Sequence, residues 1–320
     1  MHIPDGFLDG KTALTAAAFS AVGLGVALRQ VRRELPPRRM PLLGLSAAFL
    51  FAAQMVSFPV AGGTSGHLMG SVLVAALLGP SAAIVVMTTV LIVQCFLFAD
   101  GGVTALGANL FNMGILGGGG GYLAYRLVSC RISGLRGRVT GVAFGGWCST
   151  VLASVGCAGQ LAWSHTVAWT AGFPMMASVH MLVGIGEAVI GALAYLAVQR
   201  TRPDLLSDGE PAGQARARRG SFRYGLLATL GLAVFVAPFS CPWPDGLESV
   251  ASTLGFEARA APSLVPAVAP DYRIPGIHSA AGATAIAGAL GTLVVFGLAL
   301  VLGRILVRKR EISPAQDPPR

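Results

Sequence analysis

Charged residues are scarce in this chain. Of its 320 residues only 12% are Asp, Glu, Lys or Arg, whereas 54% are hydrophobic. A soluble domain carries about a quarter charged residues, and apolar runs of helix-spanning length recur along most of this sequence. One large soluble core is therefore excluded, and we predict an all-α, polytopic integral membrane protein.

Disulfide, zinc-knuckle and nucleotide-binding motifs are missing. The five cysteines are scattered and none forms a Cys-x-x-Cys pair, which gives no indication of a disulfide framework or a zinc knuckle. No Gly-x-x-x-x-Gly-Lys-Ser/Thr loop is present, so this chain is not expected to hydrolyse ATP itself. The sequence also lacks a His-Glu-x-x-His motif, or a comparable carboxylate pair, that would supply the general base of an intramembrane metalloenzyme. We therefore expect no enzyme activity.

The apolar sequence falls into nine segments that can cross or enter a bilayer. Their approximate bounds are 11–28, 41–58, 66–78, 81–99, 102–127, 138–162, 177–199, 223–239 and 280–306. The turn-forming pair Gly79-Pro80 separates the third segment from the fourth and favours a helical hairpin. With the N-terminus outside, all Lys and Arg residues except Lys11, Arg259 and Arg273 lie inside, as the positive-inside rule favours. The net charge of +9 thus reflects membrane topology, and no nucleic-acid partner is expected.

A linker divides the sequence into two modules. The stretch 201–222 is polar and rich in Pro and Gly, which is typical of a linker, and the topology places it in the cytoplasm. It separates a seven-span module, 1–200, from a two-span module, 223–320. We expect both modules in the cell membrane, in contact with lipid, with the C-terminus in the cytoplasm.

The first two residues form a potential chelate. The opening Met-His-Ile-Pro-Asp-Gly-Phe lacks the basic stretch of a signal peptide, so Met1 is expected to begin the mature protein at the outer surface. Its α-amino nitrogen, the His2 amide nitrogen and the His2 imidazole can close two fused rings around one metal ion. Square-planar nitrogen geometry is typical of Ni(II) or Cu(II), whereas Ca and Mg prefer oxygen ligands.

A fourth nitrogen is available from His67. This residue ends the Gly-rich loop 59–67, which the topology places on the same side as Met1, and glycine lets a backbone approach a ligand closely. However, a histidine at position 2 also occurs by chance, and a Gly-rich loop with one histidine is more often a plain turn. From the residues alone, metal binding and these simpler interpretations both stay open.

Three groups of residues resemble one family of membrane proteins. They are Met-His-Ile-Pro-Asp-Gly-Phe-Leu at 1–8, Gly-Gly-Thr-Ser-Gly-His-Leu at 62–68, and Phe-Ala-Asp-Gly-Gly at 98–102 followed by Leu-Gly-Ala-Asn at 106–109 and Phe-Asn-Met-Gly at 111–114. Over about 1–200, their order and spacing resemble the CbiM/NikM family. Members of that family are the substrate-binding (S) components of cobalt and nickel energy-coupling-factor (ECF) ABC transporters.

The resemblance implies a seven-span fold whose outer N-terminus is inserted inward. The metal ligands it implies are the Met1 amine, the His2 amide and imidazole, and His67. The implied partners are a transmembrane coupling (T) subunit and two ATP-binding cassette ATPase subunits. The implied substrate is Co²⁺ or Ni²⁺, with cobalt uptake serving cobalamin biosynthesis. Four planar nitrogens suit Ni(II), but low-spin Co(II) adopts the same geometry, so the choice between the two ions stays open.

An alternative function is a stand-alone secondary transporter of divalent metal ions. Such a carrier needs intramembrane carboxylates to couple ion gradients, and Glu187 is the only acidic residue deep in a predicted span. Because charge inside a membrane is expensive, Glu187 is a functional candidate, and a structural hydrogen bond is the competing interpretation.

The second module resembles the PDGLE domain that is fused to some family members. The similar motifs are Pro-Asp-Gly-Leu-Glu at 244–248 and Asp-Tyr-Arg-Ile-Pro-Gly at 271–276. The module is expected to take the place of the small two-span CbiN/NikN subunit of other systems. Asp245 and Glu248 either attract cations outside or simply begin a helix.

Other polar residues receive secondary roles. Those expected to support the metal ligands, or to bond other helices instead, are Thr64, Ser65, Asn109 and Asn112. His165 and His180 are expected near the outer surface, either as plain surface residues or on an entry path. His278 lies in the second module and can approach the site only if that module folds over it.

Overall fold

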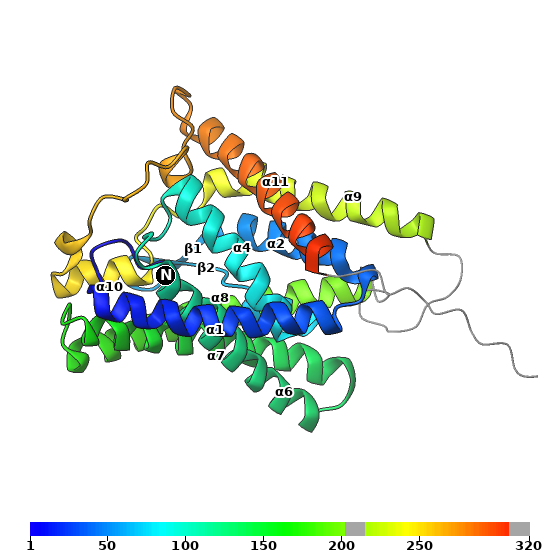
Figure 1. Cartoon of the computed structure of the whole chain (residues 1–320), viewed down its shortest axis with the longest axis horizontal. Helices are drawn as coiled ribbons and strands as arrows, with labels where there is room; N and C mark the ends of the chain where they lie inside the picture. Colours follow the sequence, from blue (N-terminus) through cyan, green and yellow to red (C-terminus); the bar gives the residue numbers. More distant parts are fainter. Residues whose placement is uncertain (202–214, 307–320) are drawn as a thin grey trace, which may run out of the picture.

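The computed structural model describes residues 1–201 and 215–306, and helices dominate them (Figure 1). Most of the predicted linker, 201–222, and the basic residues after 306 lie outside the described residues. In the first module the elements are α1 (Gly10–Glu34), η1 (Pro37–Arg39), α2 (Met40–Gln54), β1 (Ser57–Val60), β2 (Thr64–His67), α3 (Ser71–Leu78), α4 (Pro80–Phe98), α5 (Leu106–Asn109), η2 (Leu110–Gly120), α6 (Gly121–Arg131), α7 (Gly134–Trp163) and α8 (Trp169–Thr201).

The second module contributes two further long helical stretches and a loop region between them. Its elements are α9 (Ala215–Gly231), η4 (Leu232–Val236), η5 (Ala237–Phe239), α10 (Gly246–Leu254), η6 (Glu257–Arg259), η7 (Pro270–Tyr272) and α11 (Ala280–Leu306). The helix α9 begins at Ala215, which lies inside the stretch that the sequence assigns to the linker.

Helices are found in all nine predicted apolar segments, and the fold class is confirmed as that of a polytopic helical membrane protein. In the part of the chain that the structure describes, five helices are long and apolar enough to cross a membrane: α1, α4, α7, α8 and α11. The fifth predicted segment is a continuous helical run, because α5, η2 and α6 follow one another without a break. The eighth combines α9 with two short helical turns that end at Phe239.

The third segment differs from its prediction. Residues 64–67 form the strand β2, paired antiparallel with β1, and the helix α3 starts only at Ser71. Gly70 precedes it with φ +72°, a left-handed conformation that breaks the strand from the helix. With eight residues, α3 rises about 12 Å, less than half of the roughly 30 Å hydrocarbon core. Within the third segment, only Ser71–Leu78 is helical. The Gly79-Pro80 hairpin between α3 and α4 is present, with Pro80 as the first residue of α4.

Glycines permit the closest helix packing in the first module. A Cβ atom at Gly121 would lie 2.7 Å from the carbonyl oxygen of Gly145 in α7, so the two backbones nearly touch. The run 110–120 preceding it is π-helical, a form that usually occurs as short bulges near functional sites. Small residues at such crossings let membrane helices pack by close backbone approach.

The second module packs against the first rather than standing apart. The helix α11 crosses α2 (Figure 1), and a Cβ atom at Gly291 of α11 would lie 2.1 Å from the Phe51 ring of α2. The short helix α10 lies against α8 and β2. Figure 1 also shows that the amino terminus lies inside the assembly of helices, near the strands, and not at its periphery. The two modules thus enclose the start of the chain together.

Candidate metal centre

The amino-terminal segment is held in place by backbone bonds. The Ile3 side chain is fully buried. The Ile3 backbone N–H donates to Asn109 Oδ1 (2.8 Å), and Asn109 Nδ2 donates to the Ile3 carbonyl (3.1 Å). This two-way bond satisfies both backbone groups of Ile3 inside the protein. Asn112 does not share this role, because its side chain pairs with Gln160 of α7 at 2.7 and 3.1 Å. The two asparagines therefore support different parts of the fold.

The loop after α4 closes over the same segment. The Gly102 N–H donates to the Ile3 carbonyl (2.9 Å), and the Asp5 carboxylate accepts from the Thr104 N–H (2.8 Å) and hydroxyl (2.5 Å). A Cβ atom at Gly102 would lie 2.3 Å from the Asp5 nitrogen. Only glycine allows this approach, so the loop 99–104 fits an inserted amino terminus closely.

This fit gives the first prediction. Gly102→Ala is expected to push the amino-terminal segment out of its site, because overpacking of this kind costs about 1–3 kcal/mol. Since about 1.4 kcal/mol is a tenfold change, hydrogen exchange in peptide 1–8 should quicken by about 5- to 100-fold. The matched control is Gly25→Ala in α1, where an added Cβ meets no atom within 4 Å. Equal protection of peptide 1–8 in both variants would contradict the fit.

The three residues predicted as ligands come together at the inner end of this segment. The Met1 amine lies 2.9 Å from His67 Nε2, and the His2 and His67 rings stack with centroids 5.5 Å apart and planes 19° apart. The side chains of Met1 and His2 are 9% and 7% exposed. Among the described residues, no three His, Cys, Asp or Glu side chains form a metal-binding group. This centre instead combines two imidazoles with backbone nitrogens of the chain's first two residues.

Two glutamines that sequence reasoning missed connect the histidines. His2 Nε2 lies 3.2 Å from Gln94 Oε1, Gln94 Nε2 donates to Gln54 Oε1 (2.9 Å), and Gln54 Nε2 donates to the Met69 carbonyl (3.0 Å). The chain of amides runs from His2 through α4 and α2 to the loop that follows His67. In the sequence, each glutamine is visible only as a single amide side chain in a largely apolar segment.

Glu187 fixes the loop after His67. Its carboxylate oxygens accept the backbone N–H groups of Met69 (2.6 Å) and Gly70 (2.8 Å). Such charge-assisted bonds to backbone N–H groups are stronger than neutral ones. Of the two interpretations of Glu187, the structure supports the structural one, because this carboxylate satisfies the backbone that carries His67.

The second module reaches the centre through Asp245. One carboxylate oxygen caps α10 by accepting the Leu247 and Glu248 N–H groups (2.8 and 2.9 Å), and Glu248 completes a capping box. The other oxygen, Oδ2, lies 2.8 Å from the Met1 amine. The helix-start interpretation of this motif is therefore supported, but Asp245 also contacts the candidate ligand. His278, the predicted point of approach, is exposed instead.

Thr64 and Ser65 face the second module. The Thr64 hydroxyl lies 2.8 Å from that of Ser249, and the Ser65 hydroxyl donates to the Trp243 carbonyl (2.7 Å). They were predicted to support the metal ligands. In the structure their side chains join β2, the strand that carries His67, to the region around α10.

His180 is not a plain surface residue, which was one of its two interpretations from the sequence. It is 3% exposed, and its Nδ1 lies 2.8 Å from the Met176 carbonyl. A cavity of about 30 Å³ is lined by His180 together with Met1, His67 and Asp245. Burial follows from α10, since a Cβ atom at Gly246 would lie 2.8 Å from His180 Nε2.

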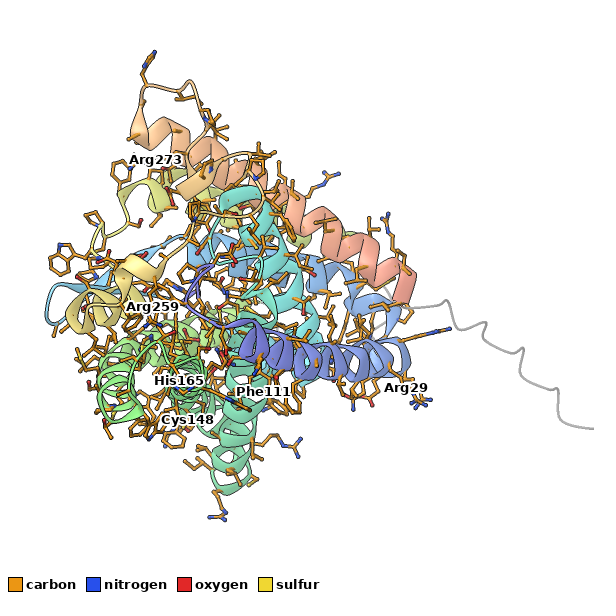
Figure 2. The ribbon with its side chains drawn as sticks, turned by 60° about the vertical axis from the view of Figure 1, so that its left-hand side comes forward. Arg29, Phe111, Cys148, His165, Arg259 and Arg273 are labelled. Carbon is orange, nitrogen blue, oxygen red and sulfur yellow. The ribbon has the colours of Figure 1, made fainter. Side chains whose placement is uncertain are left out.

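His165 does match the surface interpretation. It is exposed, and its carbonyl accepts from the Arg259 guanidinium (3.1 Å). Figure 2 shows the two residues near each other, with Arg29 at the far end of α1. His165 therefore joins the connection between α7 and α8 to η6 of the second module through its backbone.

Charge at the centre is arranged around the amine. Burial lowers the pKa of His67 to about 3, aided by the neighbouring Met1 ammonium. Burial alone would raise the pKa of Asp245, but the ammonium beside it holds that pKa well below its usual value. A neutral imidazole keeps a lone pair available to a metal ion, and two carboxylates, Asp245 and Asp100, lie beside Met1 and His2. The arrangement suits a divalent cation held by nitrogen ligands.

Comparison with known proteins gives a match for each of the two modules. Residues 2–205 match the CbiM family, described as the cobalt uptake substrate-specific transmembrane region, and residues 219–308 match the PDGLE domain. A protein of Archaeoglobus fulgidus named as a fused nickel transport protein, NikMN, is 34% identical over 95% of this chain and 98% of its own length. The fused nickel transport protein NikMN of Rhodobacter capsulatus is 32% identical over 86% of this chain and 84% of its own.

A solved structure shares the fold of the first module. It is titled as a truncated transition metal transporter, is 32% identical, and covers 62% of this chain and 99% of its own length with a TM-score of 0.57. The two modules therefore each match a described family or domain, and the fold of the first has a counterpart in a solved structure. The chain belongs to the CbiM family of cobalt uptake substrate-specific transmembrane proteins and carries a PDGLE domain after it.

Proposed function

We propose that this chain is the substrate-binding component of an ECF-type ABC importer that captures Ni²⁺ or Co²⁺ at the outer face of the cell membrane. The observation that carries the proposal is the distance of 2.9 Å between the Met1 amine and His67 Nε2, with the His2 ring stacked alongside. The metal ion would take four nitrogens: the Met1 amine, the His2 amide and imidazole, and His67.

The surroundings suit a metal ion that replaces protons. Binding would displace a proton from the Met1 ammonium and one from the His2 amide, and the two carboxylates beside them would then balance the charge of the cation. Gln94 lies at the His2 Nε2 atom, so the Nδ1 atom would bind the metal in place of its present partner, Asp100 Oδ1. Hydrogen-bonding partners of this kind orient a ligating imidazole.

Nickel is the ion we favour. Relatives that match over both modules are named as nickel transport proteins, although the family description names cobalt. Planar nitrogen ligands suit Ni(II). A role in cobalamin biosynthesis would apply only to cobalt uptake.

The proposed orientation has the N-terminus outside and the C-terminus in the cytoplasm. In Figure 1, α10 and the start of α1 lie toward the same end of the molecule, and Arg29 lies at the other end of α1 (Figure 2), as the positive-inside rule favours. The partners would be a transmembrane coupling subunit and two ATP-binding cassette ATPases. Their ATP hydrolysis would reorient the loaded component, and release would follow when the amino-terminal segment leaves the site.

Uptake of radioactive nickel by cells that lack their own importer tests this function. Cells that make the chain with its coupling and ATPase subunits are expected to accumulate nickel, and cells with ATPases that cannot hydrolyse ATP are not. Equal accumulation by the chain alone would contradict the proposal and favour the stand-alone secondary transporter. Competition between nickel and cobalt for the purified protein would decide the ion.

A further inference from the structure

The second module touches the candidate centre at two points. The first is the contact of 2.8 Å between Asp245 Oδ2 and the Met1 amine. The second runs through Tyr272, whose hydroxyl donates to Asp100 Oδ2 (2.5 Å), while Asp100 Oδ1 lies 3.1 Å from His2 Nδ1. Both residues of the amino-terminal chelate are thus held by carboxylates that the second module either supplies or positions.

The backbone around each contact is fixed. The Ser65 N–H donates to the Pro244 carbonyl (2.8 Å), directly before Asp245, so the His67 strand and the PDGLE motif hold each other. Tyr272 and the preceding Asp271 both have positive φ, +57° and +52°, a conformation that costs energy for residues other than glycine. The Tyr272 ring stacks on Phe98 of α4 at 4.7 Å. Packing against the first module therefore keeps Tyr272 in place.

The two carboxylate oxygens of Asp245 have different roles. Oδ1 accepts the N–H groups of Leu247 and Glu248 and begins α10, whereas Oδ2 faces the Met1 amine. The Met1 side chain is 9% exposed, and a charged amine in such a place is stable only with an opposite charge beside it. His67 Nε2, the amine's other neighbour, carries no negative charge.

We propose that Asp245 is a positioning residue for the amino terminus: it holds the Met1 amine beside His67 before a metal ion arrives. This inference rests on the proposed function, in which that amine is a ligand. The PDGLE module would then complete the binding site of the first module, because the chelate is presented ready-formed and does not have to be ordered by the metal. A coordinated amine keeps two N–H groups, so the same oxygen can accept from it afterwards.

The test measures whether Met1 stays in its site without metal. The full chain, with a free amino terminus and a tag at its C-terminus, is placed in lipid nanodiscs with a chelator and treated with an amine-acylating reagent. Labelling of Met1 is compared with that of exposed Lys11 in the same molecule. In the wild type Met1 should react more slowly than Lys11. In Asp245→Asn it should react at least about tenfold faster than in the wild type, because the buried ammonium has lost its counter-charge.

Two further variants separate the charge from the helix cap. Asn caps helices as well as Asp does, so Asp245→Asn keeps the start of α10. Glu248→Gln removes a charge from the same capping box but not from Met1, and should leave Met1 protected, while Asp245→Glu should restore part of the protection. Hydrogen exchange in peptide 1–8 gives a second reading that does not depend on amine reactivity.

The outcomes distinguish this inference from the proposed function. Unchanged protection of Met1 in Asp245→Asn, or equal exposure in Glu248→Gln, overturns the role of Asp245. Nickel binding to the wild type is measured separately by calorimetry. A wild type that binds no nickel or cobalt overturns the proposed function, whatever the labelling shows about Asp245.

Discussion

Replacing His67 with alanine is expected to weaken nickel binding by about 100- to 1,000-fold. Structural zinc sites with four ligands have binding free energies of about 10–16 kcal/mol, so one ligand in four accounts for roughly 2.5–4 kcal/mol. About 1.4 kcal/mol corresponds to a tenfold change in affinity. The other three nitrogens belong to the first two residues, and His67 is the ligand that a different part of the fold supplies. Titration of the purified chain with nickel, in competition with a chelator of known affinity, measures the loss.

His278→Ala is the matched control for this variant. His278 is an exposed histidine of the second module, so its loss removes an imidazole without touching the centre and should leave the affinity within about twofold of wild type. Thermal unfolding of both variants without metal should be similar, because the Glu187 bonds to Met69 and Gly70 remain. If His67→Ala bound nickel with the affinity of the wild type, His67 would not be a ligand, and the proposed centre would be contradicted.

Periodicity and composition predicted the helices because membrane spans are local features. A run of about 20 apolar residues specifies a helix wherever it lies, since backbone groups in lipid must be satisfied within the segment. The segment 66–78, of which only Ser71–Leu78 is helical, is apolar but begins with glycines and His67. There the backbone pairs with β1 and with the Glu187 carboxylate, which lies more than a hundred residues away in the sequence. Apolar content alone does not reveal such partners.

The candidate ligands could be proposed from the sequence because their chemistry lies in two adjacent residues and one loop, and the structure brings these residues together. Their supports could not be proposed from it, because each is a contact between distant segments. The pairing of Met1 with Asp245 joins the start of the chain to the second module, and the buried His180 is packed against α10 at Gly246. Gln54 and Gln94 looked like isolated amides in apolar helices. A polar group in a membrane helix needs a partner, and this rule marks both as candidates without naming what they bind.

Lengthening the chain before Met1 should abolish tight metal binding altogether. A leader peptide converts the Met1 amine into an amide, which removes one ligand and the charge that Asp245 holds. It also needs room, and the cavity beside Met1, His67 and His180 measures only about 30 Å³, space for one or two water molecules. The extended segment therefore cannot enter its site, and the His2 nitrogens should be lost with it.

The leader is best made removable, so that one preparation serves as its own control. A protease that cuts directly before Met1 would regenerate the free amine without changing any other atom. Affinity for nickel should fall by more than about 1,000-fold with the leader attached, since more than one of four ligands is lost, and should return after cleavage. Labelling of Met1 against Lys11 would report whether the freed terminus has reinserted. If the uncleaved chain bound nickel as tightly as the cleaved one, the metal would have to sit elsewhere, because no amine would then be present beside His67.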